Sequence, residues 1–213
     1  MTCTALLVID MQRDFLDPGG YAAGAGLDIS ALRQPIATIQ ALLSAARRAG
    51  MLIVHTREGH RPDLSDCPSS KLARSRVAGA EIGSQGPLGR LLIRGEHGHD
   101  IIDELQPQAG EPVVDKPGYS AFVNTDLPGL LTNRGIRRLI FTGVTTEVCV
   151  HSTLRDAIDR GYECLLVADG CASPYPELQT AALQMVGVEG GIFGRVVHSS
   201  ELLQQIESQE VSS

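Results

Sequence analysis

The sequence predicts a single α/β domain of three layers, in which a doubly wound, mostly parallel, six-stranded sheet carries helices on both faces. Six short apolar runs recur along the chain, and helical segments separate them. Strands that read as continuous apolar runs are buried on both faces, which is typical of parallel sheets. Their alternation with helices indicates the doubly wound class. A length of 213 residues suits one domain over 1–213.

The expected elements follow in order along the chain. Strands are expected at 5–9, 51–54, 112–115, 138–142, 163–168 and 195–198. Helices are expected where apolar residues recur at helical spacing or where a cap and a glycine bound the segment, at 29–48, 145–161, 178–188 and 200–206. Residues 207–213 are expected to form a frayed tail. The Gly- and Pro-rich stretch 58–98 is expected to be partly ordered and to line a site or a subunit contact, since long loops are often functional.

Composition narrows the function classes. The net charge is −7, so neither nucleic acid nor an anionic membrane surface is an expected partner. Five cysteines, an odd number without a CxxC pair, argue against a disulfide framework or a thiolate zinc site. We find no secretory signal and no apolar run of about 18 residues, and therefore expect a cytoplasmic protein.

Cys149 is the first candidate for chemistry. An apolar strand runs into Thr145 and Thr146, either of which can cap the following helix, so that Cys149 falls in the first turn. The positive end of the helix dipole favours the thiolate, which is the nucleophilic form. The alternative at this point is a small buried hydrophobic residue.

Two other reactive side chains are expected near Cys149. Asp10 ends the first strand and Lys116 ends the third, and ligands of such sheets bind beyond the carboxyl ends of the strands. A thiolate can attack a carbonyl carbon, a carboxylate can carry the thiol proton to a leaving amine, and an ammonium can hold that carboxylate. His151 is two residues from Cys149 and faces a different side of a helix, so we do not expect it to act as the base.

The motifs VIDMQRDF (8–15), KPG (116–118), GVTTEVC (143–149) and GGIFG (190–194) resemble the isochorismatase-like cysteine hydrolase superfamily over nearly the whole chain. The stretches 55–66 and 94–96 resemble its biuret hydrolase branch, and residues 152–156 are similar to ureidoacrylate amidohydrolases. The resemblance implies a catalytic triad of Asp10, Lys116 and Cys149. It also implies a cis Val144–Thr145 peptide and an oxyanion hole formed by the N–H groups of Thr145 and Cys149.

The same resemblance implies the reaction. It points to a cofactor-free amidohydrolase that cleaves a C–N bond of a small urea-like substrate through a thioester or thiocarbamate and releases ammonia. A homo-oligomer, either a dimer or a tetramer, is also implied. The alternatives are a ureidoacrylate-type or nicotinamide-type amidase, an isochorismate-type vinyl ether hydrolase, which would lack the cysteine, and a non-catalytic binding module on the same fold.

One departure from the biuret hydrolase pattern concerns Glu189, where that branch has Gln. A carboxylate only accepts hydrogen bonds, so Glu189 predicts a substrate end rich in N–H donors or a local basic partner. The alternative is a solvated glutamate at a helix end. Glu58-Gly59-His60 stands where nicotinamidases carry a zinc-binding Asp-x-His, but a well-placed later histidine is missing. No metal is therefore expected.

The remaining candidate binding residues either line a substrate pocket or simply pack in the core. The proposed pocket walls are aromatic, and one arginine is a candidate for closing over the substrate: Phe15, Tyr21, Tyr119, Phe122 and Arg61. Arg13 and Asp14 fit a structural ion pair as well as they fit binding residues.

Overall fold

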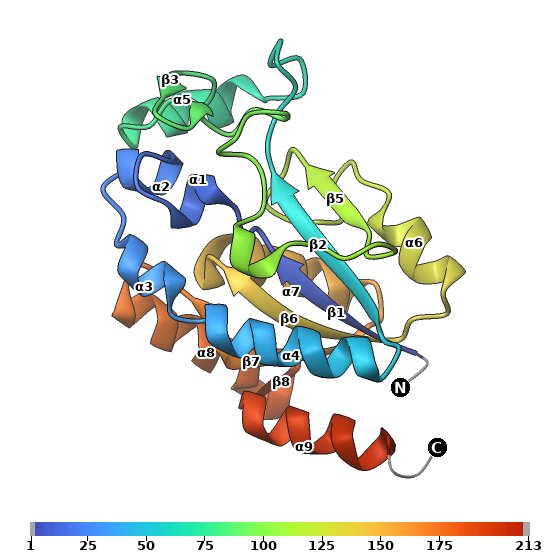
Figure 1. The fold of residues 1–213 in the computed structure, drawn as a ribbon. Coiled ribbons are helices and arrows are strands. Elements are labelled where there is room, and N and C mark those ends of the chain that lie inside the picture. The colour runs from blue at the N-terminus through green and yellow to red at the C-terminus, as the bar shows by residue number, and fades with distance from the viewer. Residues whose placement is uncertain (1–2, 211–213) are drawn as a thin grey trace.

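The computed structural model of the protein describes residues 3–210, and its centre is one six-stranded sheet (Figure 1). The strands are β1 (Thr4–Ile9), β2 (Leu52–Glu58), β5 (Val113–Lys116), β6 (Arg138–Val144), β7 (Glu163–Ala172) and β8 (Arg195–Val197). They lie in the order β5-β2-β1-β6-β7-β8, and all neighbours pair in parallel. The predicted doubly wound α/β fold is confirmed.

Helices cover both faces of the sheet. One face carries α3 (Ile29–Arg33), α4 (Ile36–Arg48) and α9 (Ser199–Glu210), and the other carries α6 (Leu127–Asn133), α7 (His151–Asp159) and α8 (Pro176–Gly191). The side chains of β1 alternate between two cores, with Leu6 and Val8 in the first and Leu7 and Ile9 in the second. This alternation explains why β1 is apolar at every position.

The order of the strands reverses beside β1. From β1 the chain adds β2 and β5 in one direction, and then β6, β7 and β8 in the other. The switch point lies between β1 and β6, where the connections leave in opposite directions and a crevice opens beyond the carboxyl ends of the strands.

Several predicted boundaries were wrong. The helix expected over 29–48 is two helices, because Pro35 has no N–H to continue the first one. β2 extends to Glu58 although its second half is polar, because it pairs with β5 there. The helical assignment reaches Glu210 rather than ending at 206, so residues 207–210 are not a tail; residues 211–213 lie outside the described range.

The stretch 58–98 is partly ordered, as predicted. It contains α5 (Ser69–Val77) and a hairpin of β3 (Gln85–Gly86) and β4 (Gly89–Arg90). The sequence did not predict α6, nor the shorter elements α1 (Arg13–Leu16), α2 (Tyr21–Gly24) and η1 (Asp103–Leu105). In Figure 1, α5 and β3 lie beyond the tip of β2 and next to α2. Within residues 3–210, no helix has both the length and the apolar character needed to cross a bilayer.

Candidate active site

Four buried polar side chains meet beyond the carboxyl ends of the strands. Asp10 follows β1, Glu58 ends β2 and Lys116 ends β5, and Cys149 lies in the turn after β6. Each of these residues is 4% exposed or less. The sulfur of Cys149 and an oxygen from each carboxylate all lie within 4.8 Å of one another. The site therefore contains the three residues predicted to form a triad and a second carboxylate that was not predicted to act there.

Asp10 is held on both sides of its carboxylate. Thr56 Oγ1 donates a hydrogen bond of 2.6 Å to Oδ1, and Lys116 Nζ lies 2.8 Å from Oδ2. The backbone of Asp10 has a φ of 52°, a left-handed conformation that carboxylate side chains tolerate better than most. Burial raises the pKa of Asp10 above its ordinary value, although the charge of Lys116 acts in the opposite direction.

Lys116 is fully buried and remains an ammonium. Burial alone would lower its pKa, but the negative charges of Asp10, Cys149 and Glu58 raise the pKa above its ordinary value. Its Nζ also donates to the backbone oxygen of Gly118 at 3.0 Å. One fixed positive charge thus serves both carboxylates of the site, at 2.8 Å from Asp10 and 3.7 Å from Glu58.

Cys149 lies in a π-helical turn, η2 (Thr146–Val150), that leads into α7. The Val144–Thr145 peptide before this turn is cis, as the family resemblance implied. Thr153 Oγ1 donates to the backbone oxygen of Cys149 at 2.7 Å and anchors the turn. His151 contacts the backbone of Ala182 in α8, in agreement with its expected orientation away from the thiol.

The resting thiol of Cys149 is protonated. Burial raises its pKa well above the ordinary value, and the negative charges of Glu58 and Asp10 act in the same direction, while Lys116 lowers it. Burial and the two carboxylates therefore oppose the effect expected from the start of the helix. The field of one short turn is outweighed by burial beside two carboxylates.

Glu58 is the residue that sequence reasoning missed as a side chain of the reaction centre. Its Oε2 accepts the Cys149 thiol at 3.1 Å, and its Oε1 lies 2.6 Å from Nζ of Lys71 on α5. The Lys116 and Lys71 charges and its hydrogen bonds outweigh burial and lower the pKa of Glu58. The sequence places Glu58 at the start of the Gly- and Pro-rich stretch 58–98, whereas the structure places it at the end of β2. The available signal was its position at the end of a parallel strand, next to that of Asp10.

Gln12 fixes the backbone of Glu58. Its amide nitrogen donates to the Glu58 oxygen at 2.9 Å, and its amide oxygen accepts from the Glu58 N–H at 2.7 Å. The same nitrogen also donates to the backbone oxygen of His99 at 2.9 Å. β1 has ended at this level, so a side-chain amide replaces the backbone partner that a neighbouring strand would provide.

Within the described residues, Asp10, Glu58 and Cys149 are the one group whose donor atoms converge as metal ligands would. Two ammonium groups already lie 2.8 and 2.6 Å from these carboxylates, so the cluster is not a bare set of anionic donors. His60, which belongs to the stretch compared with the zinc motif, instead lies 3.3 Å from Asp66. These contacts do not fit a resident cation.

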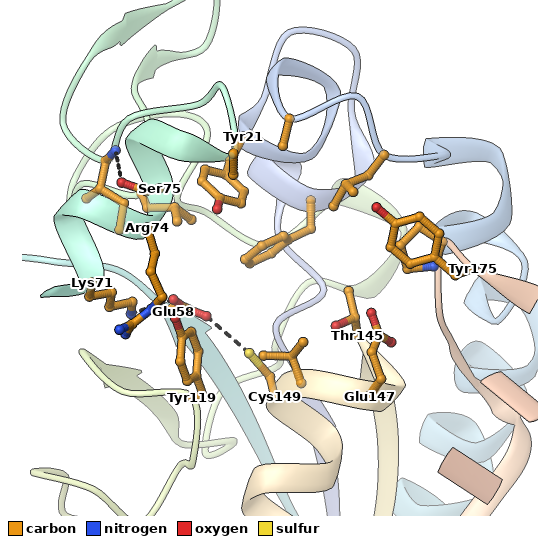
Figure 2. Close-up of a pocket in the computed structure, with 18 residues that line it drawn as sticks. Tyr21, Glu58, Lys71, Arg74, Ser75, Tyr119, Thr145, Glu147, Cys149 and Tyr175 are labelled. Carbon is orange, nitrogen blue, oxygen red and sulfur yellow. Dashed lines mark hydrogen bonds and ion pairs between the residues drawn. The ribbon is translucent and has the colours of Figure 1, made fainter. Parts of the chain in front are cut away.

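A cavity of about 420 Å³ opens in front of Cys149 (Figure 2). Apolar side chains form much of its wall, while Glu58, Lys71 and Cys149 lie at one end. Three of the predicted pocket residues line it, namely Phe15, Tyr21 and Tyr119. Burial raises the pKa of Tyr21 to about 12, so its hydroxyl remains neutral. The volume suits a small organic molecule.

The other predicted binding residues lie elsewhere. Phe122 packs in the second core, with its ring centre 6.0 Å from that of Tyr162. Arg61 and Glu189 are exposed and are not among the residues that line the cavity. Glu189 has a φ of 51° where the helical geometry of α8 is broken, so its position is that of a helix-end residue.

Arg13 and Asp14 do not pair with each other. Arg13 Nη2 contacts Asp103 at 2.6 Å, whereas Asp14 accepts the backbone N–H groups of Leu92 and Tyr21 at 2.8 and 3.3 Å. Both therefore brace the chain around α1 rather than reaching the cavity.

The geometry at the switch point defines a class of protein, namely an α/β protein with a buried cysteine between two carboxylates and an ammonium. Comparison with known proteins gives the family. A model of the isochorismatase domain matches residues 4–199, and the chain belongs to this family of isochorismatase-like cysteine hydrolases.

Solved structures agree with this assignment. A cysteine hydrolase from Pseudomonas syringae pv. phaseolicola 1448A is 30% identical, with a TM-score of 0.82 and coverage of 97% of this chain and 93% of that one. An isochorismatase family protein from Desulfovibrio vulgaris subsp. vulgaris str. Hildenborough is 29% identical, with a TM-score of 0.79 and coverage of 96% and 98%. N-carbamoylsarcosine amidase from Thermoplasma acidophilum is 25% identical, with a TM-score of 0.69 and coverage of 92% and 96%.

Proposed function

We propose that the protein is an amidohydrolase that cleaves a C–N bond in a small urea-like amide and releases ammonia. The observation that carries this proposal is the convergence of the Asp10 carboxylate, the Lys116 ammonium and the Cys149 thiol beyond the carboxyl ends of the strands, where Cys149 also lines the cavity. The likeness to an N-carbamoylsarcosine amidase supports amide chemistry. The biuret-like substrate belongs to this proposal and rests on the motifs of residues 55–66 and 94–96.

In the proposed first half-reaction, the thiol proton passes to Asp10 while Sγ attacks the carbonyl carbon. The C–S bond forms, and the electron pair of the C=O bond moves onto oxygen. The N–H groups of Thr145 and Cys149 hold this oxyanion. Asp10 then gives its proton to the nitrogen, the C–N bond breaks, and ammonia leaves a thioester or thiocarbamate on Cys149.

In the second half-reaction, a water molecule attacks the same carbon and Asp10 takes its proton. The C–S bond breaks, the proton returns to sulfur, and a carboxylate or carbamate departs. A raised pKa suits Asp10 to this alternation, because the group must carry a proton in one step and release it in the next. Lys116 stays charged throughout and keeps Asp10 oriented.

The test is ammonia release from biuret, N-carbamoylsarcosine, a ureidoacrylate analogue, nicotinamide and maleamate, with wild type and Cys149→Ala. Turnover of a ureido compound that is lost in the variant is the expected result. Preferred turnover of nicotinamide or maleamate would place the enzyme in another amidase group. Absence of turnover, together with slow alkylation of Cys149 by iodoacetamide, would favour the non-catalytic alternative.

A further inference from the structure

We propose that Glu58 binds the substrate, by accepting an N–H from the nitrogen attached to the carbon that Cys149 attacks, and that Lys71 of α5 holds it for this task. This inference rests on the proposed function and adds to it the residue that binds the amide N–H beside the scissile carbonyl. It assigns to Glu58 the role that the sequence had suggested for Glu189.

The first support is the position of Glu58 relative to sulfur. Oε2 lies 3.1 Å from Sγ of Cys149, and the residue lines the cavity. A carbon poised for attack lies about 3–3.5 Å from the nucleophile. A nitrogen bonded to that carbon is only about 1.3 Å further along the substrate. The N–H of such a nitrogen can therefore come within hydrogen-bond reach of Oε2.

The second support is the way in which the carboxylate oxygens of Glu58 are occupied. Oε1 is taken by Lys71 at 2.6 Å, whereas Oε2 has the thiol at 3.1 Å and Lys116 at the longer distance of 3.7 Å. When the thiol proton moves to Asp10, Oε2 loses its nearest donor. A buried carboxylate oxygen without a donor is unfavourable, so a substrate N–H would replace the thiol at that moment.

The third support is that the pKa values of the two carboxylates are shifted in opposite directions. Asp10 has a raised pKa, whereas the lysines keep the pKa of Glu58 low. Environments that push the pKa values of a pair apart separate a proton carrier from a group that stays ionised. An ionised carboxylate makes charge-assisted hydrogen bonds to N–H donors. Glu58 thus suits binding, and Asp10 suits proton transfer.

Lys71 ties this role to α5. Besides Glu58, its Nζ donates to the backbone oxygen of Pro117 at 2.7 Å and lies 4.9 Å from the ring centre of Tyr119. Figure 2 shows Lys71 and Cys149 on opposite sides of Glu58. The helix that lines the cavity therefore also fixes the proposed acceptor.

The test uses two alkylating probes that differ in their N–H groups, 2-iodoacetamide and 2-iodo-N,N-dimethylacetamide. Each forms a C–S bond between Sγ of Cys149 and the methylene carbon and releases iodide, so the amide nitrogen lies one bond farther from the attacked carbon than in a substrate and reports an N–H acceptor beside sulfur. Peptide mass spectrometry measures the rate at that residue. The ratio of the two rates does not depend on the fraction of Cys149 present as thiolate. Dividing it by the same ratio for glutathione corrects for the different intrinsic reactivities of the probes. The mono-N-methyl probe, which keeps one N–H, separates the effect of bulk.

We expect wild type to favour iodoacetamide by about 10-fold or more, as a hydrogen bond to a charged group implies. The preference should fall in Glu58→Gln and disappear in the double variant Glu58→Met with Lys71→Met, which also removes the partner charge. Glu111→Gln is the matched control, because Glu111 is a carboxylate paired with Arg47 away from the cavity. It should keep the preference.

An unchanged preference in folded Glu58→Gln and in the double variant would overturn the inference, as would a wild type without preference. A different outcome is that both probes alkylate Glu58→Gln more slowly than wild type while the ratio of their rates stays the same. That result would make Glu58 the acceptor of the thiol proton instead. Failure of the proposed function is a separate result, because it appears as absent ammonia release while the probe ratio still responds to Glu58.

Discussion

Nζ of Lys116 lies 2.8 Å from Oδ2 of Asp10, although β2 separates the strands from which they come. The lysine side chain crosses beyond the end of β2 and reaches a carboxylate two strands away. Both groups are fully buried, so neither can exchange its partner for water. Removing the charge of Lys116 leaves the Asp10 carboxylate buried without its ionic partner, and breaking a buried pair in this way commonly costs about 3–5 kcal/mol.

The first prediction concerns the proton carrier. Asp10→Asn should lower kcat for ammonia release by roughly 10²–10⁴-fold, because an amide cannot take the thiol proton. The measurement is steady-state turnover of the best substrate, with circular dichroism to confirm folding. Glu111→Gln should retain wild-type turnover. A folded Asp10→Asn protein within a few-fold of wild type would contradict the role of Asp10.

The second prediction concerns the ammonium. Lys116→Met should raise the pKa of Cys149 further, because Lys116 is the group that lowers it. The pH at which iodoacetamide alkylation of Cys149 becomes fast should move upward. Arg138→Gln, which removes a cation from an exposed pair with Glu163, should leave this profile unchanged. An unchanged profile in folded Lys116→Met would show that Lys116 does not act on the thiol.

The third prediction concerns stability in acid. Hydrogen bonds from Arg47, Gln108 and His55 outweigh burial and lower the pKa of Glu111 to about 2, from 4.5. A depressed folded-state pKa gives stability that is present above 4.5 and is lost as the pH falls toward 2. The full shift would correspond to roughly 3 kcal/mol, and the contribution to stability is smaller because solvent screens this partly exposed group. Urea unfolding of Glu111→Gln should therefore show a shallower loss of stability over that window than wild type shows.

The fourth prediction concerns the switch point. Gly143 has a φ of 113°, and a Cβ there would lie 2.0 Å from the backbone oxygen of Ile9. Gly143→Ala should destabilise the protein by about 3 kcal/mol, because it both strains the backbone and separates β6 from β1. Gly187→Ala is the control, since a Cβ at that helical position meets nothing within 4 Å. Thermal unfolding of the two variants would distinguish them, and equal melting temperatures would refute the clash.

The sequence predicted the sheet well because buried parallel strands are apolar on both faces. Strands such as β1 and β6 therefore stand out as continuous runs. The elements that were missed depend on tertiary contacts. α5 has few apolar residues. Its Lys71 is buried because the ammonium pairs with Glu58 and donates a hydrogen bond to the backbone oxygen of Pro117.

The site was predicted in part for a similar reason. Asp10, Lys116 and Cys149 follow apolar strands, so their position at the sheet edge can be read from the chain. The shift in the pKa of Cys149 could not be predicted from the chain, because it depends on burial and on Glu58, which is 91 residues away in the sequence. The positions of Glu189 and Phe122 outside the cavity could not be predicted, because they depend on how α8 and the segment after β5 run in the folded chain.

The ordered stretch after β2 has an implication for engineering. The proposed catalytic groups lie at the carboxyl ends of the sheet strands. One continuous segment after β2 contributes a further set of residues to the cavity wall, namely Lys71, Arg74, Ser75, Ala78, Ile82 and Leu92. One part of the cavity wall is thus encoded separately from the strands that carry the reactive groups. A transplant of residues 59–98 from a relative would reshape the cavity while leaving the parallel strands unaltered. Retaining Lys71 in such a chimera would preserve the one ionic link across the junction to Glu58.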